Sequence, residues 1–130
     1  MTQTVLFPVS KGVHTISIDD PAIEWKEYPH ELPGDHSPEG TGPGEHAVVF
    51  ESRDKRIVVG VWRREADLGL IAGSGQCIDV VVEGSATLVD KDGRRVTANS
   101  GDLIIYSGED EGEWLQDGPI KKFYIQIQDK

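Results

Sequence analysis

Residues 77–106 read CIDVVVEGSATLVDKDGRRVTANSGDLIIY, and the expected architecture follows from this segment. Short runs rich in Val, Ile and aromatic residues alternate with turn residues, a pattern typical of strands and hairpins. The strand runs cover 77–83, 86–90, 94–98 and 103–106. Asp92-Gly93 is the strongest local signal, because both residues tolerate the backbone of a tight hairpin turn. The segment therefore predicts consecutive strands, the middle two joined as a hairpin.

The sequence on either side continues the same pattern. Further runs rich in Val, Ile and aromatic residues cover 47–51, 56–64 and 120–128. Many short strands at this spacing favour an all-β sandwich or barrel over alternating strands and helices. No internal repeat is visible, and 130 residues are about the size of one domain.

The first 46 residues have a different composition. They hold all four histidines and six of the seven prolines, and 32–44 is typical of a loop. We therefore divide the chain into an N-terminal arm, 1–46, and a single β domain, 47–130. The arm is apolar enough to pack across a sheet, either its own or that of a partner chain. The apolar residues in question are Leu6, Phe7, Ile16, Ile18, Ile23 and Trp25.

The charge balance excludes several classes of partner. Asp and Glu number 23 against 13 Lys and Arg, which gives a formal net charge of -10. Nucleic acids and anionic membranes need a cationic face, so neither is expected to bind. No apolar run is long enough to span a membrane, and no signal peptide is indicated, so we expect a cytoplasmic protein. The single cysteine, Cys77, excludes an intrachain disulfide.

An ordered set of short motifs resembles a known family. Residues 59–128 resemble a single-motif cupin, in the group related to ethanolamine-utilisation and (S)-ureidoglycine-aminohydrolase cupins. The matching pieces are Val59-Gly60-Val61-Trp62, Val80-Val81-Val82-Glu83-Gly84, Lys91-Asp92-Gly93, Ser100-Gly101-Asp102-Leu103-Ile104-Ile105, Trp114 and Lys121-Lys122-Phe123-Tyr124. The resemblance implies a jelly-roll β-barrel of two facing antiparallel sheets, with a pocket between them and often a homodimer.

The resemblance also indicates where a cupin metal would bind. Many cupins hold a divalent metal through three His and one Glu, which form an open catalytic site. The corresponding positions here are Ile71, Gly73, Cys77 and Gly112. Only the Cys77 thiolate could be a ligand, so we expect neither the metal nor any other cofactor. The alternative is a metal held by the arm, whose candidate ligands are Asp35, His36, Glu39, Glu45 and His46.

Five residues are candidates for ligand binding in the barrel: Cys77, Asp79, Tyr106, Trp114 and Tyr124. Side chains alternate along a strand, so Asp79 shares the face of Cys77, which the cupin pattern places toward the pocket. A carboxylate there would bind an amine or hydroxyl, or act as a general base. The alternative is an ion pair with Arg63, Arg64 or Lys122. Cys77 is better interpreted as a small buried side chain than as a nucleophile.

Acidic residues also cluster in a loop near the expected pocket rim. Glu109, Asp110, Glu111 and Glu113 either form a solvated turn or attract a cationic ligand. The sequence thus favours a metal-free cupin that binds a small polar or cationic metabolite. Two alternatives stay open: an enzyme with an atypical metal site and aminohydrolase- or isomerase-like chemistry, and a dimeric structural module with a filled barrel.

Overall fold

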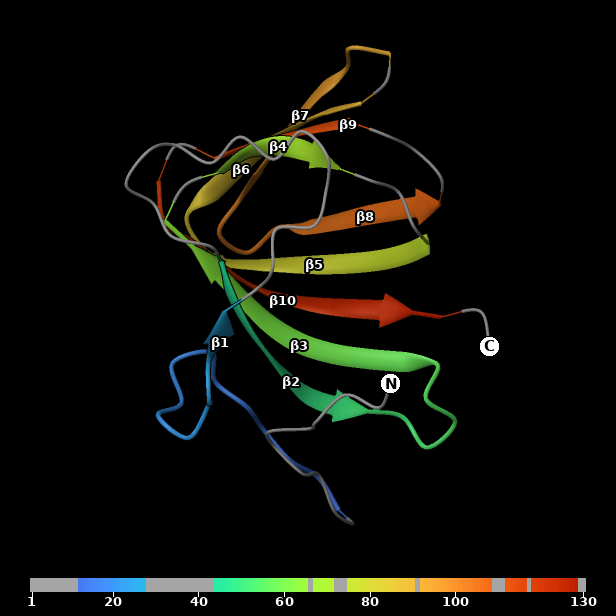
Figure 1. Cartoon of the computed structure of the whole chain (residues 1–130). Coiled ribbons are helices and arrows are strands. Elements are labelled where there is room, and N and C mark those ends of the chain that lie inside the picture. Colours follow the sequence, from blue (N-terminus) through green and yellow to red (C-terminus); the bar gives the residue numbers. More distant parts are fainter. Residues whose placement is uncertain are drawn as a thin grey trace.

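The computed structural model describes residues 12–27, 44–65, 67–71, 75–90, 92–108, 112–116 and 118–128. Within these ranges the chain forms ten strands and no helix (Figure 1). The strands are β1 (Lys26–Glu27), β2 (Glu45–Glu51), β3 (Ile57–Arg64), β4 (Asp67–Ile71), β5 (Gly75–Glu83), β6 (Ser85–Asp90), β7 (Arg95–Asn99), β8 (Leu103–Gly108), β9 (Gly112–Gln116) and β10 (Ile120–Ile127).

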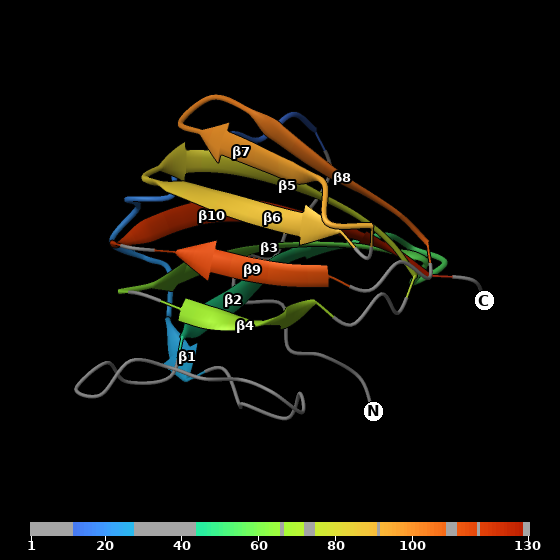
Figure 2. The same cartoon turned by 90° about the horizontal axis from the view of Figure 1, so that it is seen from above.

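The strands form two antiparallel sheets. The larger has the order β1-β2-β3-β10-β5-β8, and the smaller has the order β4-β9-β6-β7. Seen from above, the smaller sheet lies across the larger one (Figure 2). The predicted all-β jelly-roll architecture is therefore confirmed. The sequence analysis does not predict strands β4 and β9. Each has only five residues, and Gly69 in β4 and the polar Glu113 and Gln116 in β9 interrupt the apolar pattern that marks a strand.

The predicted hairpin at Asp92-Gly93 joins β6 to β7. Gly93 has a φ of 82°, which glycine adopts without the steric cost of a side chain. The Asp90 carboxylate accepts hydrogen bonds from the backbone N–H groups of Asp92 and Arg94, both at 2.9 Å. Local sequence chemistry is thus sufficient to define this turn.

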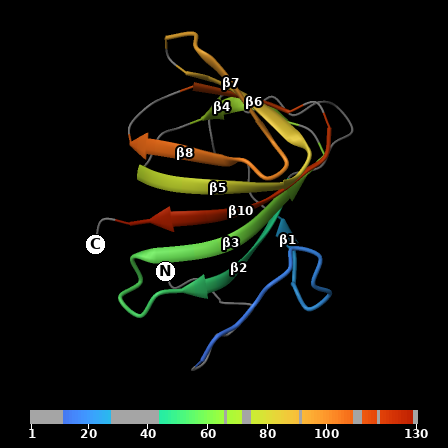
Figure 3. The same ribbon diagram turned by 180° about the vertical axis from the view of Figure 1, so that it is seen from behind.

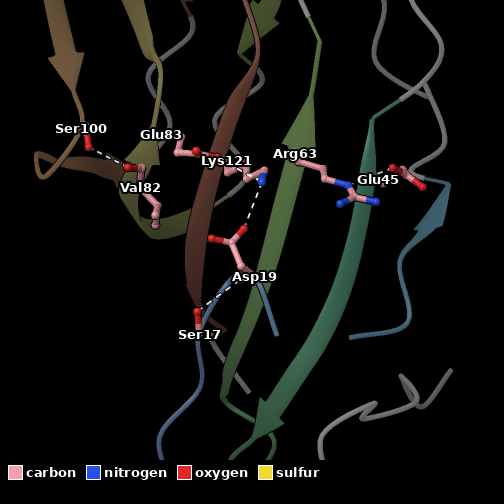
Figure 4. A network of polar contacts seen from close by, with 8 residues as sticks. All are labelled: Ser17, Asp19, Glu45, Arg63, Val82, Glu83, Ser100 and Lys121. Atoms are coloured by element: carbon pink, nitrogen blue, oxygen red, sulfur yellow. Dashed lines mark hydrogen bonds and ion pairs between the residues drawn. The ribbon is translucent and has the colours of Figure 1, made fainter. Parts of the chain in front are cut away.

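A second predicted turn connects β7 to β8 and anchors them to β5. Asp102 accepts a hydrogen bond from the Asn99 N–H through Oδ2 at 2.8 Å, and its backbone carbonyl accepts one from Val81 at 3.0 Å. The Ser100 hydroxyl donates to the Val82 carbonyl at 2.6 Å (Figure 4). These bonds fix the position of β8, which carries one of the candidate residues.

The arm covers part of the outer face of the larger sheet. Ile18 and Ile23 are buried there with Ala47, Val49 and Val61. Lys121 contacts Asp19 at 3.0 Å and Glu83 at 3.1 Å, so one lysine joins the arm to β5 (Figure 4). Leu6 and Phe7 lie outside the described residues.

A second attachment of the arm lies next to the first, because Arg63 on β3 pairs with Lys121 on β10. The Arg63 guanidinium stacks 3.9 Å from the centre of the Trp25 ring and contacts Glu45 at 2.9 Å. The arm therefore lies on the β1–β3 side of the sheet, whereas β8 forms the other edge (Figure 3). The space between the sheets contains a separate apolar core, made of Val81, Ala86, Ala98, Ile104, Trp114 and Ile120.

Candidate functional site

The strand register places most of the candidate residues on the inner face of the larger sheet. Tyr124 on β10 pairs with Asp79 on β5, and Cys77 pairs with Tyr106 on β8. Directly paired residues of an antiparallel sheet share a face, so these four side chains point to the same side. Lys122, two residues before Tyr124, joins them there.

Asp79 is the centre of this group, with 1% of its surface exposed. Its Oδ2 atom lies 2.6 Å from the Lys122 Nζ and accepts a hydrogen bond from the Tyr106 hydroxyl at 2.9 Å. Its Oδ1 atom lies 3.7 Å from the Cys77 Sγ. Asp79 therefore forms an ion pair, and of the three candidate partners it pairs with Lys122. We call Cys77, Asp79, Tyr106 and Lys122 the Asp79 cluster.

Two tryptophans flank the Lys122 ammonium. The Nζ atom lies 4.6 Å from the ring centre of Trp62 and 4.6 Å from that of Trp114. The two rings are 6.0 Å apart and meet at 85°. A cation at this distance from an indole is attracted by the negative ring face, and two faces add to that attraction. Lys122 is thus held by one carboxylate and two aromatic rings.

Trp114 is fixed by a buried amide. Its Nε1 donates to the Gln116 Oε1 at 3.1 Å. The Gln116 Nε2 donates in turn to the backbone carbonyls of Arg64 at 2.7 Å and Gly118 at 2.8 Å. Because both ends of the Gln116 amide are bonded to fixed groups, the Trp114 ring is held in a defined orientation toward Lys122.

Within the Asp79 cluster, the Cys77 thiol and the Tyr106 hydroxyl keep their protons. Burial and the neighbouring Asp79 charge raise the pKa of the Cys77 thiol to about 11. Burial, followed by the same charge, also raises the pKa of the Tyr106 hydroxyl. Cys77 is therefore a neutral thiol at neutral pH, a state that is a poor nucleophile. Tyr106 serves as a hydrogen-bond donor.

The Tyr124 ring lies over Gly60, in space that any larger side chain at position 60 would fill. It pairs with Gly60 on β3, and its ring covers the position where a Gly60 side chain would lie. The Tyr124 phenol therefore crosses the inner face of β3, in the row next to the one that carries Trp62 and Lys122.

The residues at the expected metal positions do not fit a cupin metal. Ile71 pairs with Gly112 across β4 and β9, and neither residue has a donor side chain. Gly73 lies outside the described residues and is a glycine, so Cys77 supplies the single donor side chain among the four positions. Across the part of the chain that the structure describes, no group of three or more His, Cys, Asp or Glu side chains is placed to hold a metal ion.

The arm alternative is only partly described. Asp35, His36 and Glu39 lie outside the described residues, as do Glu109, Asp110 and Glu111 of the acidic loop. His46 pairs with Trp62 on β3, and burial together with the Lys26 charge lowers its pKa. Glu45 is engaged by Arg63. Glu113 is exposed.

A surface hollow lies away from the Asp79 cluster. It has a volume of about 330 Å³ and is lined by Arg63, Arg64, Glu65, Glu83, Gly84, Pro119, Ile120 and Lys121. Two of its cations already have acidic partners, since Arg63 contacts Glu45 and Lys121 contacts Asp19 and Glu83. The chemistry therefore points to the barrel interior rather than to this hollow.

Sequence reasoning missed three members of the site. The sequence indicates Lys122 only as a possible partner for Asp79, and it assigns no site role to Trp62 or Gln116. Alternation along β10 places Lys122 on the face of Tyr124, and that signal was available. Trp62 is the partner of Lys122 across β3 and β10, so its contact depends on the pairing of two distant strands. The hydrogen bond from Gln116 to Arg64 depends on how the two sheets face each other, which no local pattern contains.

Comparison with known proteins gives matches in structure only. The sequence matches no protein-family model and no curated protein. The EutQ protein of Clostridium difficile superimposes with a TM-score of 0.68 at 20% identity, over 97% of this chain and 98% of that one. A DUF861-family protein of unknown function from Pseudomonas syringae gives a TM-score of 0.72 at 18% identity, over 93% of this chain and 50% of that one.

Further matches indicate the same fold. A cupin superfamily protein from Desulfitobacterium hafniense gives a TM-score of 0.57 at 14% identity, over 82% of this chain and 99% of that one. A protein described as ethanolamine utilization protein Q, from Salmonella typhimurium, gives 0.60 at 15% identity, over 68% of this chain and 72% of that one. The protein therefore has the cupin fold. EutQ proteins are among the cupin-fold structures that it resembles.

Proposed function

We propose that this protein is a metal-free cupin-fold protein that binds a small polar metabolite at the Asp79 cluster. The observation that carries the proposal is the buried pair of Asp79 and Lys122, whose side chains are 2% and 14% exposed. A buried ion pair loses much of its Coulombic energy to desolvation and is a weak way to stabilise a fold. A charged pair inside the barrel is therefore better explained by binding than by packing.

The neighbouring core supports this argument. Next to the Asp79 cluster the chain fills the space between the sheets with apolar side chains, including Val81, Ile104 and Ile120. If the side chains at this place served only to fill the barrel, we would expect an apolar residue at position 79 as well. The cluster instead offers a carboxylate, an ammonium, a phenol and a thiol within a small region. These groups suit a ligand that carries an amine or hydroxyl.

Ethanolamine is a suitable first probe, because it carries both groups and gives its name to the EutQ protein of Salmonella typhimurium. Ethylene glycol is its neutral counterpart and separates polar from cationic recognition. We expect calorimetry to detect binding of ethanolamine to the wild-type protein, and at least tenfold weaker binding to Asp79→Asn. Asp92→Asn, in the exposed β6–β7 hairpin, is the matched control and should bind as the wild type does.

Two results would contradict the proposal. One is that neither probe binds the wild-type protein. The other is that Asp79→Asn binds the probes as tightly as the wild type does. The enzyme alternative, with an atypical metal site, gains no support from the described residues, among which no three His, Cys, Asp or Glu side chains are grouped to hold a metal ion and Glu45 is paired with Arg63.

A second proposal is that the protein forms a homodimer through the outer face of the larger sheet. Leu103 and Ile105 on β8 are 59% and 70% exposed. They pair with Val80 and Ile78 on β5, so four apolar side chains lie side by side on this face. We propose a second copy of the chain as the occupant. In a protein with a net charge of -10, an uncharged face suits an identical uncharged face better than a charged partner.

A further inference from the structure

The surroundings of Lys122 have the composition of a site for an organic cation. Two indole faces, each 4.6 Å from the ammonium, and one carboxylate at 2.6 Å enclose the charge. Proteins that bind alkylammonium ligands use the same combination of aromatic faces and a negative group. We call Trp62, Trp114 and Asp79 the ammonium cage. Here the cation inside it belongs to the chain itself.

We propose that the ammonium cage is a binding site for a small alkylammonium ion, and that Lys122 occupies it until such a ligand displaces it. The inference rests on the proposed function for the location of the site and adds the class of ligand. Two of the three cage walls have contacts that do not involve Lys122. Trp114 is fixed by Gln116, and Asp79 keeps its hydrogen bond from Tyr106 when the lysine leaves.

Lys122 would then set the selectivity of the site. A group tethered to the cage competes as though it were present at millimolar concentration or higher, so an amine with no other contact binds weakly. A ligand must gain further contacts to displace it. The Tyr106 hydroxyl and the Cys77 thiol border Asp79, and they are placed to contact a hydroxyl on the same ligand. The lysine stem is flexible enough to swing out of the cage.

Lys122→Ala tests the cage directly, because it removes the internal cation and leaves the walls. We expect this variant to bind ethylammonium at least tenfold more tightly than the wild-type protein does, measured by calorimetry. Adding Asp79→Asn to Lys122→Ala should abolish the gain. Lys121→Ala is the matched control, since Lys121 forms its ion pairs with Asp19 and Glu83 elsewhere and its loss should leave ethylammonium binding unchanged.

A second measurement uses the wild-type protein and does not depend on the variant folding. The Lys122 side chain lies against two indole rings, so its ε-methylene protons should resonate upfield of those of other lysines. Titration with ethanolamine should move this signal toward the position of a free lysine as the ammonium is displaced. If calorimetry shows that ethanolamine is bound and the signal still stays upfield, the proposal is overturned. A folded Lys122→Ala variant with no gain in ethylammonium binding overturns it as well.

The outcomes separate this inference from the proposed function. If the wild-type protein binds ethylene glycol through Asp79 but Lys122→Ala gains no affinity for ethylammonium, the cage is wrong and the polar binding site stands. If Lys122→Ala gains affinity while the wild-type protein binds neither ethanolamine nor ethylene glycol, the cage is correct and the proposed function is wrong.

Discussion

At the scale of single residues, the energetics of the site depend on Asp79 and Lys122 being present together. The Lys122 side chain is only 14% exposed, so its ammonium has little water to replace the carboxylate for as long as it stays between the two rings. Breaking one half of a buried ion pair leaves an uncompensated charge, whereas replacing both halves with apolar groups removes the desolvation cost as well.

We therefore expect Asp79→Ala to lower the free energy of unfolding by about 3 kcal/mol or more, measured by urea denaturation. The double variant Asp79→Leu with Lys122→Met should lose much less, because no buried charge is left. If the double variant is destabilised as strongly as the single one, the ion pair is itself needed for the fold, and the argument that it serves binding fails.

Cys77 reports on the charge of Asp79. Its thiol has a pKa raised from 9.0 to about 11, by burial first and by the negative Asp79 second. We expect Asp79→Asn to lower the Cys77 pKa, because it removes a charge that opposes the thiolate. Cys77 is the single cysteine of the chain, so a ¹³C label at its Cβ gives one signal whose chemical shift follows the titration.

The control for this titration is Asp92→Asn, which should leave the Cys77 pKa unchanged.

The raised pKa of Cys77 also predicts a pH dependence of stability. The folded thiol holds its proton more tightly than the unfolded one, so its stabilising contribution is complete below pH 9 and is lost as the pH rises to 11. Cys77→Ala should reduce that loss. If the Cys77 pKa stays at about 11 in Asp79→Asn, the Asp79 charge does not act on the Cys77 thiol and the prediction is wrong.

At the scale of elements, the turns at Gly84 and Gly93 allow two costs of a substitution to be compared: the cost of a left-handed backbone and the cost of a steric clash. Gly84 and Gly93 have φ values of 86° and 82°. A Cβ at Gly93 meets nothing within 4 Å, whereas one at Gly84 collides with the Pro119 carbonyl oxygen. We expect Gly93→Ala to lose about 1 kcal/mol of stability from the left-handed backbone alone. Gly84→Ala should lose about 1–3 kcal/mol more.

Urea midpoints of the two variants measure this difference. Equal losses would mean that the β5–β6 turn moves away from Pro119 at no cost, and that the approach of β10 to this turn is not tight. The pair is well matched, because both glycines lie in turns of consecutive strands and have almost the same backbone conformation.

The sequence predicts the elements whose stability is local. The β6–β7 hairpin depends on Asp90, Asp92 and Gly93, which are neighbours in the chain, and the β7–β8 turn depends on Asp102 in the same way. The candidate site is less accessible to such reasoning. Asp79 and Lys122 lie 43 residues apart, and they meet only because β5 and β10 pair. Of the two tryptophans beside Lys122, Trp62 is brought there by the pairing of β3 with β10, and Trp114 by the smaller sheet facing the larger one.

At the scale of the whole molecule, one row of side chains crosses the outer face of the larger sheet. Val61, Phe123, Val80 and Leu103 are successive partners on β3, β10, β5 and β8. Val61 lies under the arm with 0% exposed, whereas Leu103 at the far end is 59% exposed. The arm thus covers one end of an apolar face, and the other end lies bare at an edge strand.

An apolar face at an open edge strand favours association. We therefore expect sedimentation of the wild-type protein to give the mass of a dimer, and Ile105→Lys to give that of a monomer, because the lysine would place a charge in the proposed interface. Val96→Lys is the matched control, since Val96 is 49% exposed on β7 of the other sheet. A wild-type monomer, or an Ile105→Lys variant that is still dimeric, would contradict the proposed interface. Dissociation by Val96→Lys would instead place the contact on the smaller sheet.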